Sequence, residues 1–488
     1  MCCRKIFRSI YIEEEVINLE SHLKISHPKL MAAVLMFGSF IGLFAETALN
    51  MALTDIMEDY SIIASTGQWL TTGYLLVLAI LVPLSSYLVR WFTTRQLVTA
   101  ALIISTAGAL FAVAASSFSM LLIGRLVQAI GAGIFLPLMF NVVLMIFPIH
   151  KRGAVMGIVG LVITAGPALG PTLSGLIISV SSWKYIFVIM MVLNIILLIV
   201  GAPKMDNVSN ITKPRIDILS LVLSTVAFGG IVYALATLAE LPLSDISIWL
   251  PLAAGIIALI LFTLRQFKMT EPMVNLRVFK YPMYTVGTIL MIATLFIILT
   301  VAILLPLYLK SVLAYTAIAA GLLMLPSNLL NIILSPIVGS SFDKVGARVY
   351  TRIGFTLITI AAIVLIVIIS STTPVWQVVA VLCILFAGVA MTIMPAQTNA
   401  LNQLPPELYA DGSAAMNTLT QVAGAAGTAV AITMFTAGQN KYIEEFGAEV
   451  PVEFLAGGIN YAFYSVLVTG IIGLILSFFV KNSLPKTK

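Results

Sequence analysis

Charged residues are scarce in this sequence. They make up 9% of the 488 residues, whereas hydrophobic residues make up 60%. A soluble domain carries about a quarter charged residues. A chain with so little charge cannot cover its surface in water, so we expect lipid to surround most of it. The net charge of +6 therefore indicates basic loops at one membrane face rather than a nucleic-acid partner.

Cysteine and histidine are equally rare, with three of each in the chain. The cysteines form no CxxC pair and no metal-ligand spacing, and the histidines fall in the N-terminal tail and a loop. No GxxxxGK[ST] sequence is present, which argues against an ATP-driven pump. The first 28 residues are mixed and polar rather than a cleavable signal peptide. We expect no enzymatic activity, no cofactor and no metal.

Long apolar runs, in contrast, are abundant. A helix needs about 20 apolar residues to cross a bilayer. The sequence therefore predicts an all-α polytopic membrane protein with 14 transmembrane helices. The predicted spans are 30–52, 69–90, 96–115, 119–147, 153–180, 184–202, 216–239, 247–267, 284–309, 316–340, 349–371, 374–398, 411–437 and 456–480.

The distribution of lysine and arginine over the loops predicts the orientation of these spans. Loops on one side carry basic residues such as Arg90, Arg95 and Arg348, whereas loops on the other side carry acids such as Glu58. The positive-inside rule then places both termini in the cytoplasm and the chain in a cell membrane, inner or plasma. The loop 399–410 is an exception, because it lies on the basic side without a basic residue.

Two ionisable residues, Glu46 and Arg125, fall well inside predicted spans. Each lies about six residues, or roughly 9 Å, from the outer end of its helix, so they are expected at one level of the membrane. Such residues need a protein partner or a water-filled cavity. Proton coupling requires at least a carboxylate that can be protonated, beside a cation that keeps its charge. The alternative is an ion pair that only ties two helices together.

Further polar residues follow helical spacing. Gly42, Glu46 and Asn50 share one helix face, as do Arg125 and Gln128. Such side chains either line a hydrated cavity or form hydrogen bonds between helices. The candidates for a substrate cavity are Asn50, Gln128, Asn328, Asn331, Gln397, Asn417 and Gln421.

The stretch GLVITAGPALGPTLSGL (160–176) places glycines and prolines inside an apolar span. Gly166-Pro167 and Gly170-Pro171 repeat at a spacing of four, which puts both pairs on one stripe of the helix. Glycines permit close approach of another backbone. Prolines bend a helix, and neighbouring groups in the membrane can satisfy the carbonyls that they free. The stretch predicts a thin, bent helix, suited either to tight packing or to a surface that moves.

These residues carry a resemblance to the major facilitator superfamily. GPALGP (166–171) resembles the antiporter motif of that family, and RLVQAIGAG (125–133) resembles its RxxQGxGxA motif. ETALNMAL (46–53) is similar to the signature of the fourteen-helix drug:proton antiporter branch, which includes bacterial lincomycin and multidrug efflux permeases.

A loop motif extends the resemblance. GSSFDKVGAR (339–348) is similar to the superfamily loop GxxxDrxGrR. The equivalent loop of the first half, SSYLVRWFTTRQ (85–96), has Arg90 where the family has Asp and keeps only Arg95. The second copy is therefore the better candidate for a conformational latch. The residues of this cytoplasmic loop motif are Arg95, Gly339, Asp343, Gly346 and Arg348.

The resemblance implies two six-helix bundles joined by an inserted helix pair. The expected organisation is a cytoplasmic tail (1–29), an N-terminal bundle (30–203), a linker with two extra transmembrane helices (204–283), a C-terminal bundle (284–480) and a second cytoplasmic tail (481–488).

The resemblance also implies a function, namely proton-coupled efflux of drug-like compounds by alternating access, as in antibiotic resistance. Glu46 would bind the proton, Arg125 would be its partner, and a proton gradient would drive transport. The expected partners are small lipophilic or cationic substrates, protons and the bilayer, and a monomer suffices. One alternative is a flippase for lipids or cell-envelope precursors. Another is a membrane sensor or assembly protein that transports nothing.

Overall fold

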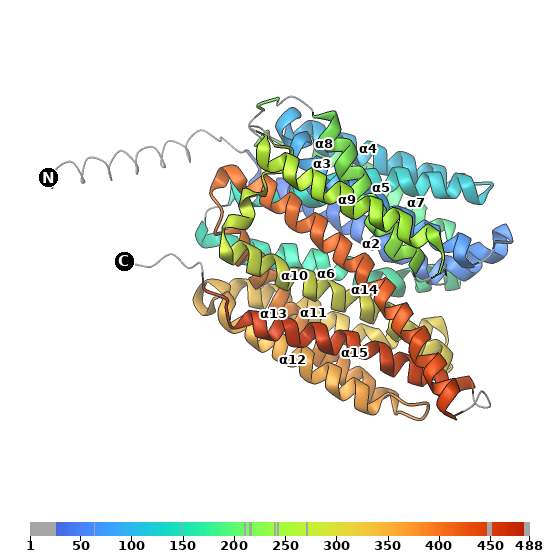
Figure 1. Ribbon diagram of the computed structural model, residues 1–488. Helices are drawn as coiled ribbons and strands as arrows, with labels where there is room; N and C mark the ends of the chain where they lie inside the picture. The colour runs from blue at the N-terminus through green and yellow to red at the C-terminus, as the bar shows by residue number, and fades with distance from the viewer. Residues whose placement is uncertain are drawn as a thin grey trace, which may run out of the picture.

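The computed structural model describes residues 26–62, 64–147, 149–208, 211–213, 217–238, 241, 244–269, 272–446 and 451–482. Within these ranges the chain is helical and contains no β-strand. The helices, labelled in Figure 1, are α2 (Pro28–Tyr60), α3 (Ala64–Trp91), α4 (Thr94–Val113), α5 (Phe118–Ile146), α6 (Ile149–Val180), α7 (Lys184–Ile196), α8 (Ile218–Leu238), α9 (Ile246–Lys268), α10 (Pro282–Leu307), α11 (Ala317–Val345), α12 (Ala347–Ile368), α13 (Val375–Leu401), α14 (Tyr409–Phe446) and α15 (Pro451–Ser477).

Side-chain caps define where several of these helices begin. At the start of α4, Thr93 accepts a hydrogen bond from the Gln96 N–H, and the Gln96 side chain accepts one from the Thr93 N–H. Ser117, Asp245 and Thr316 cap α5, α9 and α11 in a similar way. These oxygens satisfy N–H groups that have no partner within the helix.

Most of the helices are long and apolar enough to cross a membrane. Among the described residues twelve meet that test, or thirteen if the bent helix α6 counts as one span. Helix α3 contributes only a shorter apolar segment, Trp69–Val82. The chain is therefore a multi-pass membrane protein, and the count of fourteen spans remains a prediction.

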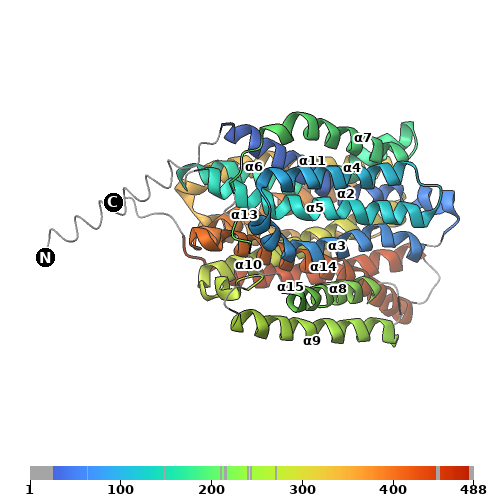
Figure 2. The ribbon, with the colours of Figure 1, turned by 90° about the horizontal axis from the view of Figure 1, so that it is seen from above.

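The helices form two groups that face each other (Figure 1). Helices α2 to α7 pack together, as do α10 to α15. The two groups meet mainly along α6 with α11 and along α3 with α14. Helix α8 packs against α3 and α14, and α9 covers α8 at the edge of the molecule (Figure 2). We call the groups the first and second halves, and the α8–α9 hairpin lies outside both.

Basic residues gather at one end of the helices, which we call the basic end. Arg90 lies in the last turn of α3, Arg265 lies in the last turn of α9, and Arg348 lies in the first turn of α12. The chain that leads into α8 is attached at this end, because the Arg90 carbonyl accepts hydrogen bonds from the N–H groups of Thr212 and Lys213.

A polar network ties the α8–α9 hairpin together at the basic end. Arg265 Nε and Nη2 donate to the two carboxylate oxygens of Asp217, over 2.6 and 3.0 Å. The Ser220 hydroxyl donates to Asp217 and accepts from Gln266 Nε2. Asp217 precedes the first residue of α8. The bonds from the Arg265 guanidinium lower the pKa of Asp217 to about 2, because they stabilise the carboxylate over the acid.

We predict that the stability contributed by Asp217 depends on pH. Its pKa in the folded protein is below the unfolded value of about 3.9, so the contribution is fully present above about pH 4 and is lost as the pH falls toward about 2. Thermal melting of the wild type and Asp217→Asn in detergent measures it. The difference in melting temperature should be equal near pH 7 and pH 5 and smaller near pH 3. An unchanged difference at the lowest pH would contradict the assignment.

Candidate functional site

A cavity lies between the two halves, lined by α2, α5 and α6 on one side and by α10, α11, α13 and α14 on the other. It contains about 100 Å³ of space that water-sized molecules can reach, which is enough for several waters. Its lining is largely apolar. The polar side chains that line it are Glu46, Thr47, Asn328, Asn331, Gln397, Asn417, Thr420 and Gln421.

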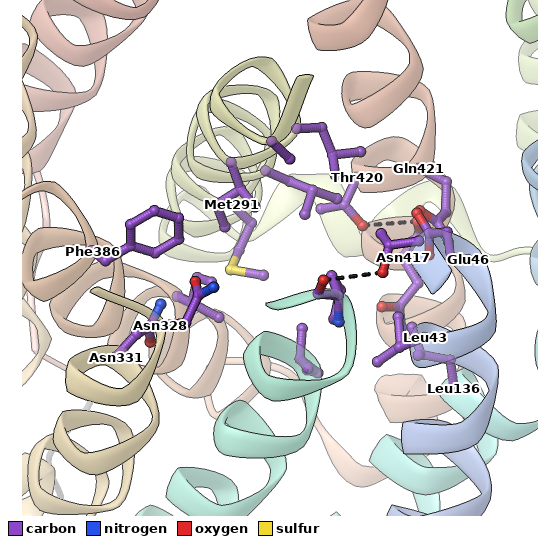
Figure 3. A pocket seen from close by; sticks show the side chains of 18 of the residues that line it. Leu43, Glu46, Leu136, Met291, Asn328, Asn331, Phe386, Asn417, Thr420 and Gln421 are labelled. Atoms are coloured by element: carbon purple, nitrogen blue, oxygen red, sulfur yellow. Dashed lines mark hydrogen bonds between the residues drawn. The ribbon is translucent and has the colours of Figure 1, made fainter. Parts of the chain in front are cut away.

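Most residues predicted for a substrate cavity meet here. Figure 3 shows Glu46, Asn417 and Gln421 on one side of the cavity, and Asn328 and Asn331 on the other. The fifth carboxamide from the second half, Gln397, also lines it. Two predicted residues are not part of this arrangement. Gln128 is absent from the lining and contacts the Met190 sulfur instead, and the side chain of Asn50 lies outside the described part of the chain.

Glu46 is the only charged side chain among the described residues that line the cavity. It is 5% exposed, and its carboxylate accepts no hydrogen bond from the described residues. A carboxylate in this position can exchange protons with water or a bound molecule in the cavity. The site therefore holds one ionisable group at the interface between the halves.

Arg125 lies deep within the first half, outside the cavity lining. Its Nη1 donates to Gln128 Oε1 over 2.7 Å, and its Nη2 donates to the Ala45 carbonyl over 2.9 Å. The guanidinium also lies 4.3 Å from the ring centroid of Tyr74. The ion pairs found between described residues join Arg90 with Asp411 and Arg265 with Asp217. Arg125 therefore contacts the backbone next to Glu46 and does not form a direct ion pair with its carboxylate.

Helix α6 is bent by 43° between Val155–Pro167 and Leu169–Val180. Its glycine stripe faces α2, in the same half. A Cβ on Gly166 would lie 2.7 Å from Leu43 Cβ, and a Cβ on Gly170 would overlap the Thr47 hydroxyl. The absence of side chains on the stripe thus allows α6 to pack directly against the helix that carries Glu46.

The bend leaves a backbone carbonyl that α2 satisfies. Pro171 has no N–H, so the carbonyl of Pro167, four residues earlier, loses its partner within the helix. The Thr47 hydroxyl donates to that carbonyl over 3.0 Å. Since Thr47 follows Glu46 in the chain, this bond joins the bent region of α6 to the residue beside the carboxylate. Pro167 and Pro171 also line the cavity.

The residues of the cytoplasmic loop motif lie in different surroundings. Gly346 has φ +82° between α11 and α12, a conformation that favours glycine. Gly339 packs against Gly157 of α6, where the two halves meet. Arg95 and Arg348 are exposed, and the Arg348 N–H donates to Asn482. The side chain of Asp343 lies outside the described residues.

A contact between the halves was missed by the sequence reasoning. At the basic end, Arg90 Nη2 of α3 lies 2.7 Å from Asp411 Oδ2 of α14, and the Asp411 side chain is 1% exposed. The loop 399–410, which has no basic residue, leads directly into Asp411. Arg90 thus supplies from the other half the positive charge that this loop lacks. An acid at the start of a helix beside a loop without cations was the available signal.

Comparison with known proteins agrees with this architecture. A sequence profile described as Major Facilitator Superfamily matches residues 35–428. The lincomycin resistance protein LmrB of Listeria monocytogenes is 48% identical over 463 residues, covering 94% of this chain and 98% of the relative. LmrB of Bacillus subtilis is also 48% identical, over 92% of this chain and 95% of the relative. The solved structure of the proton:xylose symporter XylE matches with a TM-score of 0.66 at 14% identity, covering 94% of this chain and 97% of that chain, which shows the shared fold.

We predict that Thr47→Val destabilises the protein by about 1–3 kcal/mol, because the Pro167 carbonyl loses its donor inside the membrane. Thr47→Ser keeps the hydroxyl and should remain close to the wild type. Chemical or thermal denaturation in detergent compares the two variants. No loss of stability in Thr47→Val, or a loss only in Thr47→Ser, would show that the hydrogen bond does not stabilise this contact.

We also predict that Arg90 and Asp411 are energetically coupled. Arg90→Gln leaves a buried carboxylate without its cation and should cost about 1.5–3 kcal/mol. A double-mutant cycle with Asp411→Asn measures the coupling, and Arg95→Gln, at an exposed position of the same loop, is the control. The double variant should lose less stability than the sum of the single losses. Strictly additive losses would argue against the pair.

Proposed function

Because the chain belongs to the major facilitator superfamily, we propose that it exports drug-like or lipophilic compounds in exchange for protons. The two relatives named LmrB are lincomycin resistance proteins, so lincomycin is the first compound to test. The observation that carries the proposal is the placement of Glu46 as the charged group of the cavity between the halves.

In this proposal Glu46 holds either the proton or the substrate. A proton on Glu46 neutralises the carboxylate, so a protonated cavity binds a cationic or donor-rich compound less well. Binding of the compound favours the carboxylate and expels the proton. The lack of a competing hydrogen bond from the described residues leaves the carboxylate available for both partners. Arg125 acts through the α2 backbone, since its Nη2 bonds the carbonyl of Ala45.

Alternating access would come from relative movement of the two halves. The Arg90–Asp411 pair closes the basic end between α3 and α14, and its separation would open that end. We infer that the basic end faces the cytoplasm of a cell membrane, because the positive-inside rule favours that orientation. Both termini would then be cytoplasmic, and one copy of the chain contains all the parts that the cycle requires.

The bent helix α6 would couple movement to the state of Glu46. It packs against α2 through Gly166 and Gly170 and against α11 of the other half. It also accepts the hydrogen bond from Thr47, the residue after Glu46. Glu46 therefore adjoins the residue that links α2 to α6, and α6 in turn packs against the second half. A change of charge at Glu46 would act on this chain of contacts.

We predict that Glu46→Gln abolishes substrate-driven proton movement. Inverted vesicles would carry an imposed proton gradient, and a fluorescent pH probe would follow its dissipation on addition of lincomycin. The wild type should release protons, whereas Glu46→Gln should lose at least about 90% of the response, because an amide carries no exchangeable carboxyl proton.

The matched control is Glu58→Gln, which makes the same change at an exposed position of the same helix. It should retain the wild-type response. Proton release that persists in Glu46→Gln would remove Glu46 from the coupling step. No release with lincomycin or any other compound of a drug panel in the wild type would contradict proton-coupled export, and altered membrane lipids on gene deletion would then favour a flippase.

A further inference from the structure

The polar groups of the cavity are not equally available to a ligand. The Thr47 hydroxyl donates to the Pro167 carbonyl, and the Thr420 hydroxyl donates to the Asn417 carbonyl. The Asn417 amide donates to the carbonyl and hydroxyl of Ser413. These three donors of the lining are therefore occupied within the protein.

Three groups with acceptor oxygens remain available in the lining. Gln397 is 1% exposed, and its Oε1 is buried without a hydrogen-bond partner. The Glu46 carboxylate and the Gln421 carboxamide also form no hydrogen bond with the described residues, so Gln421 presents its NH2 group as well as its oxygen. A buried acceptor without a donor is unfavourable. The Gln397 oxygen therefore requires a donor from a bound molecule or from cavity water, and the oxygens of Glu46 and Gln421 can accept one as well.

The charge of the cavity limits the ligand further. Glu46 is negative when ionised, and no lysine, arginine or histidine occurs among the described residues of the lining. An anion would meet no compensating charge, whereas a single cation would be matched by the carboxylate. A second positive charge would remain unpaired in an apolar site.

The rest of the lining is apolar and surrounds these acceptors. Figure 3 shows Met291 between the two polar sides, with Phe386 beside Asn328 and Asn331. The other apolar residues include Leu43, Leu136, Ile163, Leu295 and Ile393. A ligand that fills this space needs an apolar frame that bears donors at separate points.

We propose that the cavity selects compounds with several hydroxyl or N–H donors and at most one positive charge on an apolar frame, and that Gln397 is a specificity-determining residue for them. The inference rests on the proposed export function and names its substrate class. Gln397 contributes its side-chain oxygen to a donor of the substrate, while Glu46 receives the cationic or donor group exchanged for the proton. Compounds without donors bind through the apolar lining alone and do not depend on Gln397.

Two probes separate these classes. Lincomycin carries sugar hydroxyls, an amide N–H and one amine, whereas tetraphenylphosphonium is a monocation without a donor. In the vesicle assay, Gln397→Met should raise the half-saturating concentration of lincomycin at least about tenfold, which corresponds to about 1.4 kcal/mol, and leave the response to tetraphenylphosphonium unchanged. Gln421→Met should weaken lincomycin selectively as well, so the test does not depend on one variant folding.

Gln377→Met is the matched control, because it makes the same substitution near the start of the same helix, outside the cavity. It should respond to both probes like the wild type. If the Gln397 and Gln421 variants weaken both probes equally, or neither, the proposed selectivity is wrong while export still stands. If the wild type releases protons with neither probe, the proposed function itself fails.

Discussion

The close packing of α6 against α2 is the contact on which the rest of the site depends. The glycines of α6 remove the side chains that would separate the two helices, and Pro171 frees a carbonyl that only a neighbouring donor can satisfy. Thr47 supplies that donor from the position next to Glu46. The requirement to satisfy backbone groups inside the membrane thus fixes the bent helix to the helix that carries the carboxylate.

The two halves contribute different chemistry to one cavity. The first half supplies the carboxylate of Glu46, and the second half supplies five carboxamides from α11, α13 and α14. At the basic end the halves are joined by the Arg90–Asp411 pair. They are also joined by the packing of α6 against α11. A molecule in the cavity therefore contacts both halves at once, and its binding can change the balance between the contacts that hold them together.

Helical spacing was sufficient to predict which polar residues share a face, and residues such as Asn328, Asn331, Asn417 and Gln421 do line one cavity. The spacing of residues does not predict which neighbouring helix a given helix face packs against. Arg125 lies near Glu46 and interacts with it electrostatically, but its guanidinium bonds the Ala45 carbonyl and lies over the Tyr74 ring and does not pair directly with the carboxylate. The sequence offered a signal for Asp411, an acid at a helix start, but that position has a local explanation as well. Its pairing with Arg90 depends on how the halves pack, which spacing does not predict.

The central claim is that substrate and proton compete for Glu46. Infrared difference spectroscopy on the purified protein, recorded as lincomycin is added, tests it most directly, because a protonated carboxyl group has a C=O band that its carboxylate lacks. The account predicts loss of one carboxyl band in the wild type and in Glu58→Gln, and no such change in Glu46→Gln. Lincomycin binding without any carboxyl change in the wild type, or with the same change in Glu46→Gln, would contradict it.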